Sequence, residues 1–208
     1  MTAVRVLIAD DHMVVRMGLA AIVRHEPDLE IVGEAANGRE LLELARLHRP
    51  DVILMDLRMP GLSGAEVIAR LCEEDAATRV IVLTIHKGDE AAYQALQAGA
   101  RGYLLKDTPA SEIVAAIREV AAGGSRLAPE VATQVAQRLG RAALTARERE
   151  VLRLMGEGFS NKELAYELGM AETTTEKHVS SVLQKLGARD RIQAVRLALE
   201  RGLLDLEG

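Results

Sequence analysis

The stretch Val52–Gly64, VILMDLRMPGLSG, decides the fold of this chain. Its first four residues are apolar and lead directly to Asp56, and the chain then turns at Pro60 and Gly61. A short apolar run that ends in turn residues is typical of a strand buried on both faces of a parallel sheet. Asp56 should therefore lie at the carboxyl edge of the sheet, where open α/β folds bind their ligands. A single carboxylate there fits an ordinary loop residue equally well, so its neighbours decide its meaning.

Four more apolar runs predict strands at 5–9, 29–35, 79–84 and 102–105. Helical spacing follows each strand, over about 14–23, 37–48, 63–73, 89–97 and 108–122. Asn37 and Ser63 are expected caps, and Thr108 with Pro109 should cap and begin the last of these helices. This alternation predicts a doubly wound, flavodoxin-like α/β domain over residues 1–122, with a five-stranded parallel sheet.

The composition limits the class of protein. Of 208 residues, 49% are apolar and 2% aromatic, so aliphatic side chains must fill the cores. The single cysteine, Cys72, excludes an internal disulfide and a cysteine-cluster metal site. We find neither a signal-peptide pattern nor an apolar run of about 18 residues. We therefore expect a cytoplasmic protein that does not contact the membrane.

Polar residues follow four of the predicted strands. Asp10 and Asp11 end the first, Asp56 the third, Thr84 the fourth and Lys106 the fifth. Carboxylates brought together repel one another and require cations, and oxygen ligands suit Mg²⁺. One carboxylate can attack a phosphoryl group, while a metal and an ammonium stabilise charge on the transferred oxygens. The pattern thus indicates phosphoryl chemistry at this edge.

This arrangement resembles the receiver domain of two-component response regulators. The resemblance implies that Asp56 accepts a phosphoryl group from a histidine kinase, with Thr84 as the switch hydroxyl and Lys106 as the phosphate-pairing amine. It also implies that Tyr103 is the switch aromatic residue. The implied Mg²⁺ ligands are Asp56, Asp11, Asp10 acting largely through water, and the backbone carbonyl of Arg58.

Two further side chains lie at the expected rim of this site. Arg58 and His86 come two residues after Asp56 and Thr84, from where they can overhang the phosphoryl group. We hypothesise that they control access of water, and a purely solvated position remains the alternative. His12 is expected to touch the rim of the site.

Residues 123–141 are expected to form a linker. Gly123, Gly124 and Ser125 favour a flexible start. The helical spacing of Val131, Val135 and Leu139 then predicts a short helix, capped by Gly140.

Residues 142–208 show helical patterns only. Thr145 with Glu148, and Ser160 with Glu163, predict capping boxes at the start of two helices. A turn at Gly169 precedes a third helix, which ends at Gly187, and a fourth begins near residue 190. Two short helices joined by a glycine-containing turn are typical of a helix-turn-helix. Pattern alone is equally compatible with a helical interaction module.

The segments LTAREREVLRLMGEGFSNKELAYELGM (144–170) and KHVSSVLQKLGARDRIQAV (177–195) resemble the LuxR-type helix-turn-helix domain of NarL/FixJ-type response regulators. The resemblance implies sequence-specific binding to double-stranded DNA. The chain departs from the family pattern at two positions, where Ala171 replaces a capping serine and Glu176 replaces a lysine. With ten Lys and Arg against eleven Asp and Glu over 142–208, weak non-specific DNA binding is expected.

Glu176 has two interpretations. It either accepts a hydrogen bond from a cytosine amino group or forms a capping box with Thr173, which would start the helix two residues later. The predicted DNA contacts are Asn161, Lys162, Glu176, Lys177, Ser180 and Lys185.

The sequence as a whole predicts a transcriptional regulator that is not an enzyme. Phosphorylation of Asp56 would control homodimerisation and DNA binding. One alternative is a phosphatase or phosphotransferase that uses Asp56 as its nucleophile, although no extra loops suggest a substrate pocket. Another is a phosphorylation-independent DNA-binding or interaction protein with a vestigial receiver.

Overall fold

A computed structural model describes residues 3–85, 89–139 and 142–204. The chain divides into two compact units, one of residues 1–87 with 92–133 and one of 88–91 with 134–208. We call them the α/β unit and the helical unit and describe each separately. No helix within the described ranges is long and apolar enough to cross a membrane.

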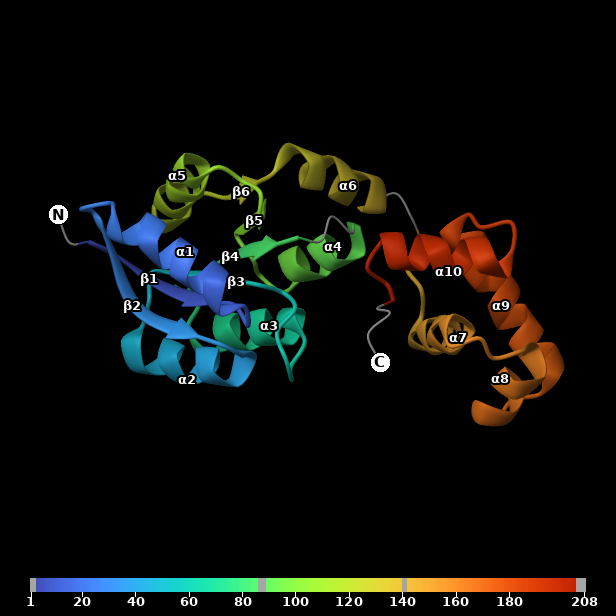
Figure 1. The fold of residues 1–208 in the computed structure, drawn as a ribbon. Coiled ribbons are helices and arrows are strands. Elements are labelled where there is room, and N and C mark those ends of the chain that lie inside the picture. The colour runs from blue at the N-terminus through green and yellow to red at the C-terminus, as the bar shows by residue number, and fades with distance from the viewer. Residues whose placement is uncertain (1–2, 86–88, 140–141, 205–208) are drawn as a thin grey trace. The chain divides into compact units, whose positions relative to one another are not determined.

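The α/β unit is built on a parallel sheet with the strand order β2-β1-β3-β4-β5-β6 (Figure 1). The five predicted strands are present, as β1 Val4–Ala9, β2 Leu29–Ala35, β3 Val52–Met55, β4 Arg79–Thr84 and β5 Gly102–Leu105. Their carboxyl ends lie along one edge, because every pair of neighbours runs in the same direction. The predicted doubly wound α/β fold is confirmed.

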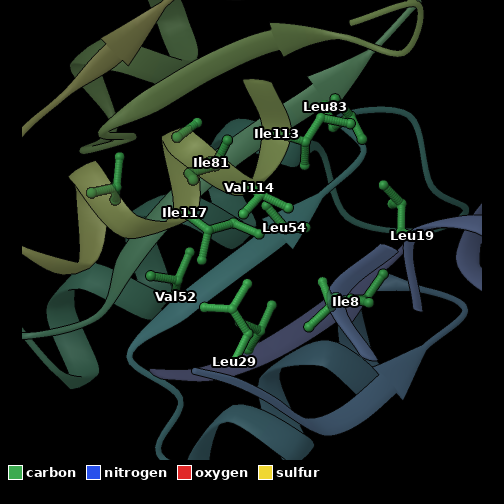
Figure 2. Close-up of a cluster of buried hydrophobic side chains, with 14 of the residues drawn as sticks. Ile8, Leu19, Leu29, Val52, Leu54, Ile81, Leu83, Ile113, Val114 and Ile117 are labelled. Carbon is green, nitrogen blue, oxygen red and sulfur yellow. The ribbon is translucent and has the colours of Figure 1, made fainter. Parts of the chain in front are cut away.

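Five helices connect the strands: α1 Met13–Arg24, α2 Gly38–His48, α3 Gly64–Glu74, α4 Asp89–Gln97 and α5 Ala110–Ala121. Helices α1 and α5 cover one face of the sheet, where Leu19 and Ile117 pack against Ile8 and Leu54 (Figure 2). Side chains alternate along each strand, so Ile53 points to the other face. This explains why β3 is apolar throughout.

The expected caps of α2 and α3 are confirmed. The side chain of Asn37 accepts a hydrogen bond from the Glu40 amide, and Ser63 and Glu66 form a complete capping box. The prediction for α5 is wrong by one residue. Pro109 is the N-cap, because its carbonyl accepts the first bonds of the helix, from the amides of Glu112 at 2.9 Å and Ile113 at 3.1 Å.

The predicted number of five strands is also wrong, since the sheet has six strands within the described residues. Strand β6, Arg126–Leu127, pairs in parallel with Gly102 and Tyr103 of β5. The amides of Arg126 and Ala128 donate to the carbonyls of Arg101 and Tyr103, each at 3.0 Å. Two residues are too few to show periodicity, and only the free edge of β5 makes them a strand. The linker helix is present as α6 Pro129–Leu139, whereas its expected cap, Gly140, lies outside the described residues.

The helical unit contains α7 Ala146–Gly156, α8 Asn161–Glu167, α9 Glu172–Leu186 and α10 Arg191–Glu200. Both predicted capping boxes are present, at Thr145 and Ser160. Gly169 and Gly187 have positive φ values of 61° and 68°, which glycine adopts without strain and which end α8 and α9. Leu152, Leu164 and Val182 join the core that holds α7, α8 and α9 together.

Replacing Ser63 with alanine should lower the free energy of unfolding of the α/β unit by about 1 kcal/mol, because the Glu66 amide loses its capping acceptor. Chemical denaturation of the whole chain measures the change. Ser111→Ala, within the first turn of α5, is the matched control and should change stability by less than about 0.5 kcal/mol. Equal losses for the two variants would contradict a capping role for Ser63.

Candidate functional site

The carboxyl ends of four adjacent strands bring together the residues predicted at this edge. Asp10 follows β1, Asp56 follows β3, Thr84 ends β4 and Lys106 follows β5. Backbone hydrogen bonds fix these positions, since the Asp56 amide donates to the Ala9 carbonyl and the Lys106 amide to the Thr84 carbonyl, each at 2.9 Å. The sheet register therefore sets the geometry of the site.

The ammonium of Lys106 lies between two carboxylates. Its Nζ is 2.6 Å from Oδ2 of Asp56 and 2.7 Å from Oδ2 of Asp10. Asp10 is 1% exposed and Asp56 5% exposed. Burial opposes the charge on Lys106, but the hydrogen bonds that its ammonium donates to Asp10 and Asp56 outweigh burial and raise the pKa of the amine. Lys106 is therefore a permanent cation that stabilises two buried anions.

Asp11 and His12 complete an acidic cluster. Potential ligand atoms of Asp10, Asp11, His12 and Asp56 all lie within 4.8 Å of one another. Three carboxylates supply the oxygen ligands that a hard divalent cation prefers. The sequence prediction did not include His12 among the donors, although its Nδ1 lies 2.7 Å from Oδ1 of Asp11. Its position directly after two acids at a strand end is the pattern that could have identified it.

Thr84 and Tyr103 are fully buried beside this cluster. Burial, together with the charge of Asp56, raises the pKa of the Tyr103 phenol, so the ring remains neutral. Tyr103 also pairs in register with Val82 on one side and Leu127 on the other. Tyr103 thus lies on β5, the strand that leads to Lys106, and β5 pairs with β4 on one side and with the linker strand β6 on the other.

Of the two residues predicted at the rim, Arg58 and His86, the structure describes only Arg58. The backbone amide of Arg58 donates to Oδ1 of Asp56 at 3.3 Å, while its side chain is exposed. That bond orients the Asp56 carboxylate. His86 lies outside the described residues.

In the helical unit, three predicted DNA contacts share one exposed surface. Glu176, Lys177 and Ser180 are all exposed on α9 and lie on one face at helical spacing. Helix α9 begins at Glu172 with Ala171 as N-cap and no side-chain cap bond. The alternative in which Thr173 and Glu176 form a capping box is therefore wrong, because the chain is already helical at both positions.

The other predicted contacts lie elsewhere in this unit. Asn161 and Lys162 are the first two residues of α8, with Lys162 exposed and Asn161 half-buried. Lys185 differs from them all, because its Nζ lies 2.6 Å from Oε2 of Glu148 and 3.1 Å from the Ala143 carbonyl. Its contact with DNA stays a prediction.

Glu148 is the buried centre of that contact. Its carboxylate also accepts from the Ser181 hydroxyl and the Thr145 amide, each at 2.7 Å. Burial works against ionisation of Glu148, but the bonds from Lys185, Ser181 and Thr145 outweigh it and lower the pKa to about 2. The carboxylate therefore stays charged at neutral pH.

Two family models match the chain, the response regulator receiver domain over residues 6–118 and the luxR family of bacterial regulatory proteins over residues 142–198. The chain belongs to the NarL/LuxR family of response regulators. It is 42% identical over 210 residues to the transcriptional regulatory protein LiaR of Bacillus subtilis (strain 168), covering 97% of this chain and 100% of LiaR. It is 41% identical to a probable transcriptional regulatory protein NarL of Mycobacterium tuberculosis, covering 97% and 96% of the two chains.

Solved structures agree with this family assignment. The response regulator resembles RcsB in a structure of an RcsB–DNA complex with a TM-score of 0.72 and 25% identity, covering 96% of this chain and 99% of RcsB. It also resembles the response regulator ChrA with a TM-score of 0.58 and 35% identity, covering 98% and 100% of the two chains. The chain is thus a two-component response regulator with a receiver and a LuxR-type DNA-binding domain, and its family acts in transcription regulation rather than metabolic catalysis.

Removal of the Lys106 ammonium should destabilise the α/β unit. In Lys106→Met, Asp10 and Asp56 remain buried without their shared cation, and we expect a loss of about 3 kcal/mol. Adding Asp56→Asn to this variant should recover much of the loss, because one of the repelling charges is gone. Urea denaturation of the single and double variants without divalent cations measures the coupling. Additive losses would contradict the paired arrangement.

The ionised Glu148 should make the helical unit sensitive to acid. Because its pKa is lowered in the folded state, its stabilisation is complete above the ordinary carboxyl pKa of 4.5 and is lost as the pH falls toward about 2. Relative to Glu148→Gln, the wild type should lose about 3 kcal/mol of unfolding free energy between pH 6 and pH 2. Denaturation followed at both pH values gives the difference, and parallel pH profiles would contradict the assignment.

Proposed function

We propose that this response regulator accepts a phosphoryl group on Asp56 from a sensor histidine kinase. The observation that carries the proposal is the Lys106 ammonium 2.6 Å from Asp56, because it provides a cation beside the attacking carboxylate. A carboxylate oxygen attacks phosphorus, a P–O bond forms, and the P–N bond to the kinase histidine breaks. Lys106 then stabilises charge on the phosphoryl oxygens.

The cluster of Asp10, Asp11 and Asp56 carries more negative charge than the Lys106 ammonium neutralises, which fits a site for Mg²⁺. Asp11, Asp56, the Arg58 carbonyl and, largely through water, Asp10 would hold the ion. When bound, Mg²⁺ neutralises charge on the transferred group. We further propose that Arg58 and His86 limit the access of water to phospho-Asp56 and so set its lifetime.

The proposed switch consists of Thr84, Lys106 and Tyr103. The acyl phosphate would draw the Thr84 hydroxyl and the Lys106 amine toward its oxygens. Phosphorylation changes the population of two receiver states only through such differential contacts. The state with Thr84 drawn in would keep Tyr103 buried and favour a homodimer, which matches the paired half-sites that helix-turn-helix proteins bind.

The DNA-binding part of the proposal uses residues 142–208, joined by a linker at 123–141 to the receiver at 1–122. The exposed face of α9 would enter the major groove, with Glu176, Lys177 and Ser180 toward the bases and phosphates. Asn161 and Lys162 would contact the backbone.

Operator binding by wild type and Asp56→Ala tests this function. Each protein is measured with and without a small phosphoryl donor and Mg²⁺. Wild type should bind about tenfold more tightly after treatment, within the usual range of coupling between sites, and Asp56→Ala should not respond. Equal affinity in all four measurements would overturn the proposal.

Glu176 should set part of the sequence preference. Operator selection with wild type and Glu176→Lys should give different preferred bases at one position of each half-site, because a carboxylate accepts from cytosine whereas an ammonium favours guanine. Each mismatch should cost about 1–3 kcal/mol. An unchanged preference with merely tighter binding would contradict base contact by Glu176.

A further inference from the structure

Lys185 and Lys177 lie on the same helix in different surroundings. Lys177 is exposed, whereas the Lys185 side chain is 23% exposed and its Nζ contacts the Glu148 carboxylate and the Ala143 carbonyl. An ammonium has three donors, and two of those on Lys185 are bonded within the protein. Lys185 is therefore not free to follow a DNA phosphate.

The partner of Lys185 makes this bond costly to break. Glu148 is 4% exposed, and its two oxygens accept from Lys185, Ser181 and the Thr145 amide. A buried carboxylate that loses its cation keeps the full cost of desolvation. Turning the Lys185 ammonium outward to a phosphate would leave Glu148 in that state.

The geometry links two helices at two points. Glu148 lies in the first turn of α7, whereas Ser181 and Lys185 are one turn apart on α9. At about 100° per residue, these two side chains point roughly a quarter turn away from the exposed face that carries Lys177 and Ser180. Two bonds at successive turns fix both the rotation of α9 and its position along its axis.

We propose that Glu148 and Lys185 are positioning residues for DNA binding, and that Lys185 itself makes no DNA contact. They hold α9 against α7 in the rotation that presents Glu176, Lys177 and Ser180 to the groove. This inference rests on the proposed DNA-binding function and replaces the sequence-based assignment of Lys185 as a DNA contact.

The salt dependence of DNA affinity separates the two roles of a lysine. Log affinity falls linearly with log salt concentration, and each phosphate contact increases the magnitude of this slope by about one. Below, the slope means this magnitude. We would measure this slope for the full-length, phosphoryl-donor-treated protein on its selected operator, comparing wild type, Lys185→Met and Lys177→Met. Lys177→Met, with an exposed lysine on the same helix, should lower the slope by about 1. Lys185→Met should leave the slope unchanged and weaken operator binding about tenfold.

A second measurement distinguishes positioning from partial unfolding. Loss of folded protein weakens binding to operator and to unrelated DNA by the same factor. A misplaced α9 loses base contacts first, so Lys185→Met should lose more affinity for the operator than for unrelated DNA. Lys185→Arg, which keeps the charge and the donors to Glu148, should restore operator binding.

Several outcomes would overturn the inference. A slope lowered by about 1 in Lys185→Met would make Lys185 a phosphate contact, and unchanged operator affinity would remove any positioning role. If circular dichroism shows that Lys185→Met is unfolded at the assay temperature, Lys185→Gln retains a donor to Glu148 and is subject to the same criteria. Absence of operator binding by wild type would instead refute the proposed function.

Discussion

The ammonium of Lys106 between two buried carboxylates is the interaction on which the α/β unit depends. Asp10 and Asp56 come from strands that are neighbours in space but 46 residues apart in the chain, and Lys106 comes from a third strand. Only parallel strands ending at one edge can bring these groups within hydrogen-bonding distance. At such separations in a partly dry site, an uncompensated pair of carboxylates would repel strongly. Asp10 and Asp56 are nevertheless almost fully buried, and the ammonium makes that burial tolerable.

Much of this unit could be predicted from the sequence because each strand carries its own evidence. The apolar run before Asp56 and the capping box at Ser63 are local features, and the structure retains both. The failures have a common origin in tertiary contacts. Strand β6 exists because β5 offers an unpaired edge, and His12 becomes part of a four-residue cluster because the fold brings Asp56, from another strand, to Asp10 and Asp11. Neither effect leaves a periodic pattern in the chain.

In the helical unit too, local features could be predicted from the sequence and tertiary contacts could not. Its capping boxes were predictable, since the two partners of each box lie three residues apart. Lys177 and Lys185, however, look equivalent in sequence, as basic residues on one amphipathic helix. Their difference comes from Glu148, which lies 37 residues before Lys185 in the chain. Composition therefore cannot separate a lysine that is available to DNA from one that is held by the protein.

Lys106 and Lys185 both contact buried carboxylates, but the two contacts differ in charge balance. Lys185 meets a single carboxylate, so the pair is neutral, and the Ser181 hydroxyl and the Thr145 amide donate two further hydrogen bonds to Glu148. Lys106 meets two carboxylates, with Asp11 close by, so one ammonium cannot neutralise the cluster. Excess negative charge at the carboxyl edge of a sheet favours a further cation, whereas the neutral pair of Lys185 and Glu148 has no net charge to attract one. The same type of contact thus leaves net negative charge in one unit and forms a neutral link between two helices in the other.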